Sequence, residues 1–596
     1  MTTTNPKITG IRNFMFDNRI DALVIPLTDP HLSEYVPEHY KAIKWLTGFT
    51  GSAATVILTQ NVAKLWTDSR YFIQAENQLK NSGFELEKLK IPHTPEYIDW
   101  LVDNLFQGNT VAVNGECNAA RTIKYLRKRL NSKDIELITK INCIDNLWID
   151  RPELPTGLIF EHPIQFAGIS RSDKINAIKK QMQSKGCTHH LIATLDDIAW
   201  ILNLRGNDIK YSPLFIAYLL IAEDYITLYI NINKIPEHLQ KTLISQQIGI
   251  KPYGQLSGDL KLLEINCVVL LDEATVNYKL YAAIPSVCTI VSDSNISTML
   301  KAQKTEHEIA NFKKTMIYDG IALEKFFFWL EQNSGKISLT ELSVAEKLTE
   351  LRKMQPGYFS NSFESIAAYR ENGALPHYAA EPETTKKLEP PGLFLIDSGG
   401  QYITGTTDIT RVVAFGAPTP DQINDFTLVL KGMIQLSKTT FPKGTRGFQL
   451  DAIARKPLWE QLKNFGHGVG HGVGYFLNVH EGPQAISSSG NGASAVALLP
   501  GMIISNEPGY YKQNHYGIRI ENLILVTTTE GNQPNDFYCF ETLSLCHIEK
   551  NLINKSMLTK KEIDWLNGYH KKVYQLLSEH LSPEEKSWLK NKTEDI

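Results

Sequence analysis

Five side chains that can bind a divalent metal lie in the last third of the chain, each in a short strand-like or glycine-rich segment: Asp397, Asp408, His471, Glu507 and Glu521. Four carboxylates with one imidazole suit manganese, magnesium, cobalt or zinc. Carboxylates that bridge two ions hold them roughly 3.5–4 Å apart, where both ions act on one hydroxide. The set predicts a two-metal site for hydrolysis.

The two aspartates lie in a predicted hairpin. The apolar run Leu-Phe-Leu-Ile at 393–396 ends in Asp397 and Ser-Gly-Gly, as a buried strand before a turn does. Residues 402–412 are rich in threonine and β-branched side chains and place Asp408 near the middle of a partner strand. Taken alone, Asp397 is better explained as a turn-forming aspartate. Asp408 lies inside a β pattern, so a cation or a donor must offset its desolvation.

Three histidines fall within a segment in which glycine alternates with other residues. They are His467, His471 and His480, in the sequence from Phe465 to Pro483. Alternate glycines let the backbone and an imidazole approach a ligand closely. A flexible loop or a surface histidine cluster is an equal alternative when this segment is taken alone. A phosphate-binding loop is disfavoured because no Lys-Ser/Thr pair follows.

The two glutamates lie in apolar β patterns, at 501–511 for Glu507 and at 516–526 for Glu521. Arg519 and Glu521 share one face of the second pattern by the period of two. A buried Arg–Glu ion pair that only holds structure is the alternative. The order acid, turn, acid repeats that of the two aspartates, which favours a metal site for both pairs.

Together these motifs carry a resemblance to a known family. In order they are His377-Tyr378, Asp397 with Asp408, His-Gly-Val-Gly-His at 467–471, His-Glu-Gly-Pro at 480–483, Glu-Pro-Gly at 507–509 and Arg-Ile-Glu-Asn at 519–522. The set resembles the X-prolyl aminopeptidases (aminopeptidase P) of the pita-bread metallopeptidases. Residues 66–71 and 197–206 resemble segments of the long, three-domain cytosolic type, so the resemblance covers the whole chain. Val469 replaces the threonine of many relatives, and we expect it to tune activity without abolishing it.

The resemblance implies an α/β (α+β) fold in which two related creatinase-like α/β domains precede a pita-bread catalytic domain. Two segments of the first half, 23–51 and 191–206, each run from an apolar strand pattern to a tryptophan and a glycine turn, as a duplicated unit would. We expect domains at 1–153, 154–299 and 300–545, and a carboxy-terminal extension at 546–596 that packs on the third. The third domain is expected to open with a helix that Thr305 and Glu308 cap.

The family chemistry implied is release of the amino-terminal residue from peptides with proline in the second position, by attack of a metal-bridging hydroxide. Two ions, manganese by resemblance, would bind Asp397, Asp408, His471, Glu507 and Glu521, with Asp408 and Glu521 bridging. Glu507 would take the proton, and His467 and His480 would orient the carbonyl and stabilise the oxyanion. His377 would hold the substrate. Arg519 would support a ligating carboxylate, and Arg70 would limit peptide length.

Three rival functions share this fold. Prolidase has the same metal set but usually a two-domain chain and dipeptide substrates, and the extra amino-terminal unit here disfavours it. A creatinase-like amidinohydrolase works without metals, which the intact ligand set disfavours. A non-catalytic binding module would lack ligands, and none is missing.

Composition fits a large enzyme. The 596 residues carry a formal net charge of -3, which gives no electrostatic argument for nucleic acid or an anionic membrane. No apolar run approaches the roughly 20 residues of a membrane helix, and the amino terminus lacks a signal-peptide pattern. Seven cysteines without a C-x-x-C motif favour reduced thiols. We therefore expect a cytoplasmic enzyme, and the family implies a homodimer.

Overall fold

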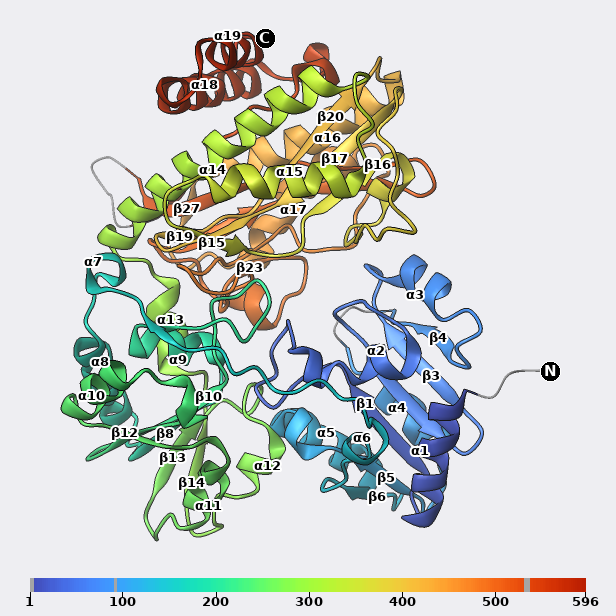
Figure 1. Cartoon of the computed structure of the whole chain (residues 1–596), viewed down its shortest axis with the longest axis vertical. Coiled ribbons are helices and arrows are strands. Elements are labelled where there is room, and N and C mark those ends of the chain that lie inside the picture. Colours follow the sequence, from blue (N-terminus) through green and yellow to red (C-terminus); the bar gives the residue numbers. More distant parts are fainter. Residues whose placement is uncertain (1–4, 91–93, 530–535) are drawn as a thin grey trace. The chain divides into compact units, whose positions relative to one another are not determined.

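The structure, a computed structural model that describes residues 5–90, 94–529 and 536–596, divides into two units (Figure 1). The first holds most of the chain up to Ser297. The second holds Thr298–Ile596 together with the short segments Pro163–Gly168 and Tyr211–Pro213. Among the described residues, no helix is both long and apolar enough to span a membrane.

The first unit contains two six-stranded sheets with the same topology. Their strand orders are β4-β3-β2-β1-β5-β6 and β12-β11-β10-β8-β13-β14. In both, the third and fourth strands of the order pair antiparallel, and the fourth and fifth pair parallel. The matched order confirms the predicted duplication. The strands are β1 (Ala22–Pro26), β2 (Thr55–Thr59), β3 (Ala63–Thr67), β4 (Glu85–Lys88), β5 (Thr110–Val113), β6 (Glu136–Ile138), β8 (His189–Ile192), β10 (Ala217–Ala222), β11 (Ile226–Ile230), β12 (Ile248–Pro252), β13 (Val268–Leu271) and β14 (Thr289–Ser292).

Helices cover the faces of these sheets, so most of the strands are buried on both sides. In β1, for example, Leu23 and Ile25 enter one apolar core and Ala22 and Val24 enter another. This double burial explains why the strands are continuous apolar runs rather than alternating patterns. The main helices of the unit are α1 (Pro6–Asp17), α4 (Glu96–Asn104), α5 (Ala120–Asn131), α8 (Arg171–Ser184), α9 (Leu195–Leu202), α10 (Glu237–Ser245), α11 (Leu256–Lys261) and α12 (Tyr278–Tyr281).

Strand β17 (Gly392–Ser398) is the middle strand of the first sheet of the second unit, between β16 (Ile366–Tyr369) and β20 (Ile409–Phe415). Its alternate residues enter two different cores. Phe394 and Ile396 pack with α14 (Glu306–Asn333) and α15 (Glu341–Lys353). Leu393 and Leu395 pack with α16 (Pro420–Ser437) and α17 (Gly447–Trp459). The parity of the strand places Asp397 on the face of Leu393 and Leu395.

The second unit also contains a sheet in the order β21-β28-β27-β24 and a separate β25–β26 hairpin. The strands are β21 (Phe441–Pro442), β24 (Ile503–Asn506), β25 (Gly509–Lys512), β26 (Tyr516–Arg519), β27 (Asn522–Thr528) and β28 (Phe537–Thr542). The single strand predicted over 516–526 is therefore wrong. The chain leaves the hairpin after Arg519 and enters the larger sheet at Asn522, so Ile520 and Glu521 lie at the junction.

The helix that opens this unit begins as predicted. Thr305 is the N-cap of α14, its side chain accepts from the Glu308 backbone N–H, and the Glu308 carboxylate accepts from the Thr305 N–H in return. This reciprocal pair satisfies two backbone donors that a helix start leaves open.

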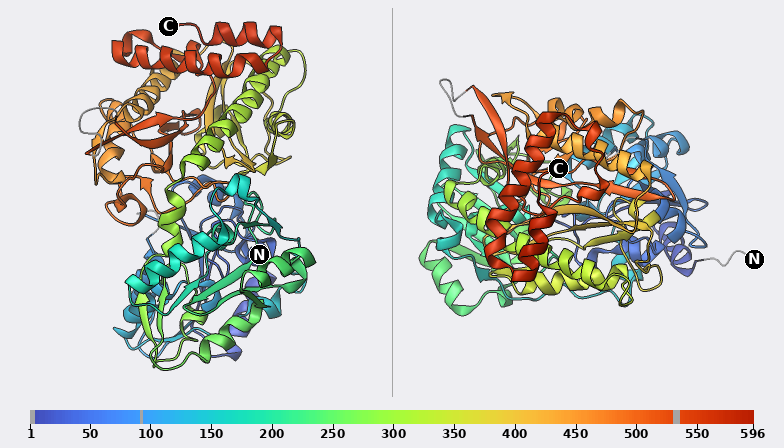
Figure 2. Two further views of the ribbon diagram at one scale, coloured as in Figure 1. Left: turned by 90° about the vertical axis from the view of Figure 1, so that its left-hand side faces the viewer. Right: turned by 90° about the horizontal axis from the view of Figure 1, so that it is seen from above.

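The chain ends in two helices, α18 (Lys560–Leu577) and α19 (Pro583–Lys592), which lie against α14 and α16 (Figure 2). Leu566, Tyr569, Val573 and Leu577 enter the main apolar core, whereas Leu576 is 38% exposed.

Candidate metal centre

The structure brings the five predicted metal ligands together. Three groups of ligand-type atoms each lie within 4.8 Å of one another, and the groups share members: Asp397 with Asp408 and Glu521, Asp408 with His471 and His480, and His471 with Glu507 and Glu521. His471 Nε2 lies 3.4 Å from Asp408 Oδ2 and 3.5 Å from Glu507 Oε1. The sequence had not placed His480 among these atoms.

The predicted β17–β20 hairpin pairing that carries the aspartates is confirmed, with one difference. Asp397 is the register partner of Thr410, and Ser398 that of Ile409. Asp408 therefore lies one residue before β20 and not in the middle of the strand. At this position the carboxylate is outside the ladder, which suits a residue that β-strands disfavour.

The alternating glycines are tightly packed, so they are not a loose loop. A Cβ atom at Gly470 would lie 1.9 Å from the Ser505 carbonyl oxygen, and one at Gly472 would lie 2.0 Å from that of Glu481. Only glycine allows this approach of backbone to backbone. Ser505 also accepts the His471 backbone N–H at 3.0 Å, which fixes the histidine between two neighbouring strands.

The two glutamates each follow a strand or hairpin and are held by their backbones. The Glu507 N–H donates to the Val469 carbonyl at 2.8 Å, and the Glu521 N–H donates to the Thr410 carbonyl at 3.2 Å. The Val469 side chain is fully buried in the apolar core. Val469 therefore positions Glu507 through its backbone and fills the core with its side chain.

Arg519 links the carboxylates to an aromatic residue that the sequence did not single out. Its guanidinium donates to Asp397 Oδ2, to Thr410 Oγ1 at 3.1 Å and to the Tyr511 hydroxyl at 2.7 Å. Thr410 in turn donates to Glu521 Oε2 at 2.7 Å. The alternation of side chains between the two faces of the β25–β26 hairpin could have indicated the contact between Arg519 and Tyr511. Gly509 pairs with Arg519, and Tyr511 lies two residues further along β25 on the same face.

His467 lies within reach of this link. Its Nδ1 is 2.7 Å from the Gly468 carbonyl, and its Nε2 is 2.7 Å from the Tyr511 hydroxyl. A carbonyl only accepts, so Nδ1 carries the proton and Nε2 accepts from Tyr511. His471 shows the same arrangement, with Nδ1 2.9 Å from the Gly472 carbonyl. In the neutral ring, Nε2 therefore carries the lone pair and faces the carboxylates of Asp408 and Glu507.

The crowded carboxylates perturb one another electrostatically. Burial raises the pKa of Asp397. The Arg519 charge opposes this shift, and the Asp408 charge adds to it. Burial and then the Asp408 charge raise the pKa of Glu521 well above its usual range. Burial raises the pKa of Glu507 to about 7 although His471 opposes it. Burial alone would lower the pKa of His471, but Asp408 and Glu507 raise it to about 9.

The donor set fits two divalent cations. Asp397 Oδ1 is buried and has no hydrogen-bond partner among the residues that the structure describes. A buried carboxylate oxygen without a donor is costly, and a cation would satisfy it. The His471 tautomer directs Nε2 into the site, as metal-bound histidines require. Divalent cations would also reverse the mutual destabilisation of the carboxylates.

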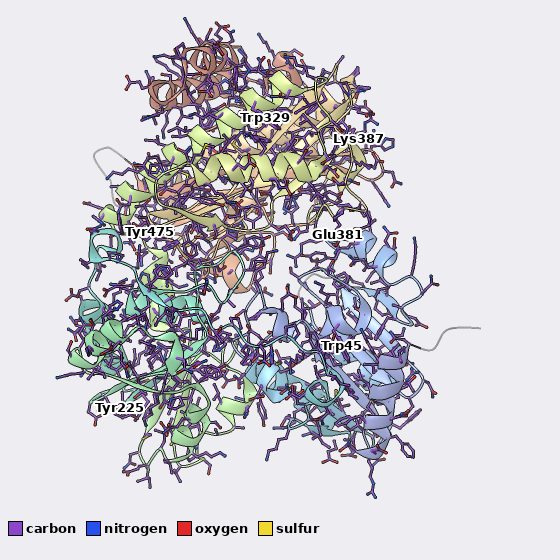
Figure 3. All side chains as sticks on the ribbon, viewed as in Figure 1. Trp45, Tyr225, Trp329, Glu381, Lys387 and Tyr475 are labelled. Carbon is purple, nitrogen blue, oxygen red and sulfur yellow. The ribbon has the colours of Figure 1, made fainter. Side chains whose placement is uncertain are left out.

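A buried ion pair of the neighbouring residue, Glu481, holds His480 next to His471. The two rings lie edge to face with their centroids 4.3 Å apart. The neighbouring Glu481 accepts from Lys304 Nζ at 2.7 Å, and both side chains are 1% exposed. The loop between the two histidines is held by Tyr475, labelled in Figure 3, whose hydroxyl donates to the Phe166 carbonyl at 2.9 Å.

The other two predicted residues are not among the ligand-type groups found in the described residues. His377 is half-buried between the short helix η5 (Arg370–Ala374) and β17, and it is not in any of the ligand-type groups found among the described residues. Arg70 belongs to the first unit, where it donates to both carboxylate oxygens of Asp68, at 2.8 and 2.7 Å. Its proposed effect on peptide length stays a prediction.

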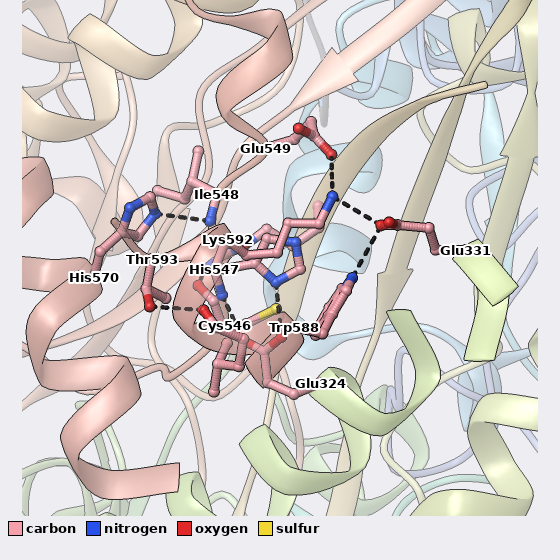
Figure 4. A network of polar contacts seen from close by, with 12 residues as sticks. Glu324, Glu331, Cys546, His547, Ile548, Glu549, His570, Trp588, Lys592 and Thr593 are labelled. Atoms are coloured by element: carbon pink, nitrogen blue, oxygen red, sulfur yellow. Dashed lines mark hydrogen bonds and ion pairs between the residues drawn. The ribbon is translucent and has the colours of Figure 1, made fainter. Parts of the chain in front are cut away.

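A second trio of ligand-type residues, Glu324, Cys546 and His547, joins α14 to the carboxy-terminal segment (Figure 4). Both Glu324 oxygens already accept from His547, one from the backbone N–H and one from Nδ1, each at 2.7 Å. Nearby, Lys592 pairs with Glu331. These contacts explain the trio as part of the packing of the carboxy-terminal helices.

Four family profiles match successive segments of the chain. The profile of metallopeptidase family M24 matches residues 310–528, and that of the C-terminal region of peptidase M24 matches 536–596. Two profiles of the creatinase/prolidase N-terminal domain match 7–146 and 150–308. The predicted fold class, two creatinase-like domains before a pita-bread domain, is confirmed.

Full-length relatives are similar to the chain along nearly all of it. Aminopeptidase P2 of Arabidopsis thaliana is 37% identical, over 97% of this chain and 86% of the relative. The crystal structure of X-prolyl aminopeptidase from Caenorhabditis elegans, described as a cytosolic enzyme with a di-nuclear active site, matches with a TM-score of 0.95 and 32% identity over 99% of both chains. An Xaa-Pro dipeptidase from Bacillus anthracis matches with a TM-score of 0.50 and 23% identity, over 63% of this chain and 98% of its own, which shows the fold alone.

Proposed function

We propose that this chain, which belongs to metallopeptidase family M24 and to its Xaa-Pro aminopeptidases, releases the amino-terminal residue from peptides with proline in the second position. The observation that carries the proposal is the convergence of the five ligand-type side chains in one cluster. Together with a full-length likeness to an enzyme with a di-nuclear site, it supports a two-metal peptidase.

Asp397, Asp408, His471, Glu507 and Glu521 would hold the two ions. When bound, the ions would supply Lewis acidity that polarises the scissile carbonyl and lowers the pKa of the attacking water. Manganese is our proposal for the metal because the family resemblance implies it. The oxygen-rich set with one nitrogen accepts several divalent ions and does not by itself select one.

Proton transfer falls to Glu507 in this proposal. Its carboxylate reaches the same cluster as His471 and Glu521, so it can take a proton from the attacking water. It would then deliver the proton to the departing proline nitrogen. That nitrogen has no hydrogen in the peptide, because the scissile bond is a tertiary amide.

Two histidines would act on the substrate carbonyl. His480 shares the cluster of Asp408 and His471, and the Tyr511–Arg519 link holds the His467 ring in one tautomer. Both would orient the carbonyl and stabilise the negative charge that develops on its oxygen. His467 would do so with a proton on Nε2, in place of the hydrogen bond that this nitrogen accepts from Tyr511. We propose that His377 holds the substrate, that Arg519 supports Asp397, and that Arg70 limits peptide length.

Cleavage of an Arg-Pro-Pro tripeptide and an Ala-Pro dipeptide by chelator-treated protein, before and after manganese is restored, tests the proposal. We expect metal-dependent release of arginine from the tripeptide and poor cleavage of the dipeptide. Preference for the dipeptide would instead indicate a prolidase, and no hydrolysis despite bound metal would indicate a binding module.

Paired variants separate the site from general stability. Asp408→Asn should abolish activity and reduce bound metal. Asp319→Asn breaks a buried ion pair with Arg352 elsewhere in the same unit, with N–O distances of 2.8 and 3.1 Å, and should leave metal content unchanged. Equal metal loss in both variants would contradict the assignment of Asp408 as a ligand.

Three further features belong to this proposal. We propose the domain boundaries 1–153, 154–299, 300–545 and 546–596, a homodimer, and a cytoplasmic location by analogy with the Caenorhabditis elegans enzyme. Limited proteolysis, sedimentation and fractionation of cells test them in turn.

A further inference from the structure

Two cysteines in the first unit lie side by side, outside the candidate metal centre. Strand β13 pairs with β14 in parallel, with Val268 opposite Thr289. Cys267 and Cys288 are the residues immediately before this pair. Continuing the register by one residue places them opposite each other. Neighbouring strands lie about 4.8 Å apart, which falls within the Cα separation of about 4.4–6.8 Å that a disulfide spans.

The two thiols also share one face of the sheet. Side chains alternate between faces along a strand, so Cys267 has the parity of Val269, and Cys288 has that of Ile290. Val269 belongs to the apolar cluster that covers this face, and Cys288 and Ile290 pack against the same cluster. Both cysteines therefore point toward the same layer.

Hydrogen bonds tie the pair to one carbonyl. The Cys267 N–H donates to the Glu264 carbonyl at 3.4 Å, and the Cys288 thiol donates to the same oxygen at 3.6 Å. The Thr289 N–H donates to the Cys267 carbonyl at 2.9 Å. The thiols also interact directly: burial, followed by the charge and the hydrogen bond of Cys267, raises the pKa of the Cys288 thiol.

Solvent reaches this pair. Cys267 and Cys288 are partly exposed, whereas Cys143, Cys187 and Cys546 are buried, and all five are free thiols. Exposure and a neighbouring thiol are the two conditions under which oxidation stops at a disulfide.

We propose that Cys267 and Cys288 form a dithiol that a low-molecular-mass disulfide, such as oxidised glutathione, converts reversibly to an intramolecular disulfide. One thiolate attacks a sulfur of the oxidant, which breaks the oxidant's S–S bond and releases one reduced thiol. The second protein thiolate then attacks the protein sulfur of the mixed disulfide and releases the other. The two thiol protons end on the two released molecules, the protein loses two electrons, and the oxidant gains them.

The bond would tie an edge strand to its neighbour. Strand β14 ends the sheet order, so β13 is its single strand partner in this sheet. A disulfide here closes a loop of about 20 residues in the unfolded chain, which lowers the entropy of the unfolded state. The oxidised protein should therefore show a higher midpoint of thermal unfolding for the first unit than the reduced protein.

Peptide mapping tests the proposal on the full-length protein. The reduced protein is equilibrated in buffers of fixed reduced-to-oxidised glutathione ratio, quenched in acid, alkylated with N-ethylmaleimide and digested without reductant. We expect a linked peptide that contains Cys267 and Cys288 and is lighter by two hydrogens than the two reduced peptides together. After denaturation, the oxidised chain should then take up two fewer maleimides than the seven of the fully reduced chain.

Single replacements give the controls. Cys267→Ser and Cys288→Ser should each lose the linked peptide and leave the other cysteine as a glutathione adduct, whereas Cys117→Ser should keep it. Adducts on both cysteines without a link, a link to a different cysteine, or no oxidation at ratios that oxidise an exposed dithiol peptide would each overturn the proposal.

Discussion

Metal affinity of the metal-free protein should rise steeply with pH, because His471 must lose a proton before its Nε2 can bind an ion. Its pKa is about 9 in the metal-free site, where Asp408 and Glu507 more than offset the effect of burial. A group with a raised pKa binds its proton below that value, so the proton competes with metal at pH 7 and stops competing above pH 9.

The size of the effect follows from the two-unit gap between pH 7 and that pKa. At roughly 1.4 kcal/mol per unit, displacing the proton at pH 7 costs about 3 kcal/mol, or about 100-fold in affinity. Between pH 7 and pH 8.5 the apparent affinity for manganese should therefore increase by about 30-fold from this group alone. Glu507, with a pKa of about 7, should make the dependence steeper below pH 7.

Calorimetric titration of chelator-treated protein with manganese measures both quantities. Repeating it in two buffers of different ionisation enthalpy gives the number of protons released on binding. We expect at least one proton per site at pH 7.5. Affinity that is flat from pH 7 to pH 8.5 with no proton release would refute the electrostatic account of the site.

Three further predictions concern the support of the site. Glu481→Gln removes the charged partner of a buried lysine, so it should destabilise the second unit by roughly 3–5 kcal/mol and, by misplacing His480, lower kcat/KM of the folded enzyme. The control Asp319→Asn should destabilise the second unit similarly and leave kcat/KM unchanged. Equal loss of kcat/KM in both variants would contradict the role of Glu481 in positioning His480. Gly470→Ala should cost roughly 1–3 kcal/mol through overpacking, whereas Gly490→Ala, with nothing within 4 Å of the added Cβ, should be neutral in thermal unfolding; a neutral Gly470→Ala would show that the backbone can shift. Removing the metal should lower the unfolding midpoint of the second unit, because the crowded carboxylates then lack counter-ions, and restoring manganese should recover it; an unchanged midpoint would mean that the ions do not bind there.

The local motifs were readable from the sequence because each is made by neighbouring residues. An apolar run that ends in an acid and a turn, glycines at alternate positions, and a threonine three residues before a glutamate each identify a feature without knowledge of its partners. The same holds for the duplicated sheets, whose strand patterns repeat along the chain. Where the sequence failed, tertiary geometry set the outcome: the strand predicted over 516–526 breaks at Ile520 because its two halves belong to different sheets.

The sequence by itself determined which donor atoms are present and the order in which strands and turns deliver them. Only the tertiary structure decided which of them meet. Arg519 and Asp397 are 122 residues apart, and their contact, like the places of Tyr511 beside His467 and of Cys267 beside Cys288, depends on how strands pair. Periodicity assigns a side chain to a face, but the partner across that face is set by register and packing between segments that the sequence does not bring together.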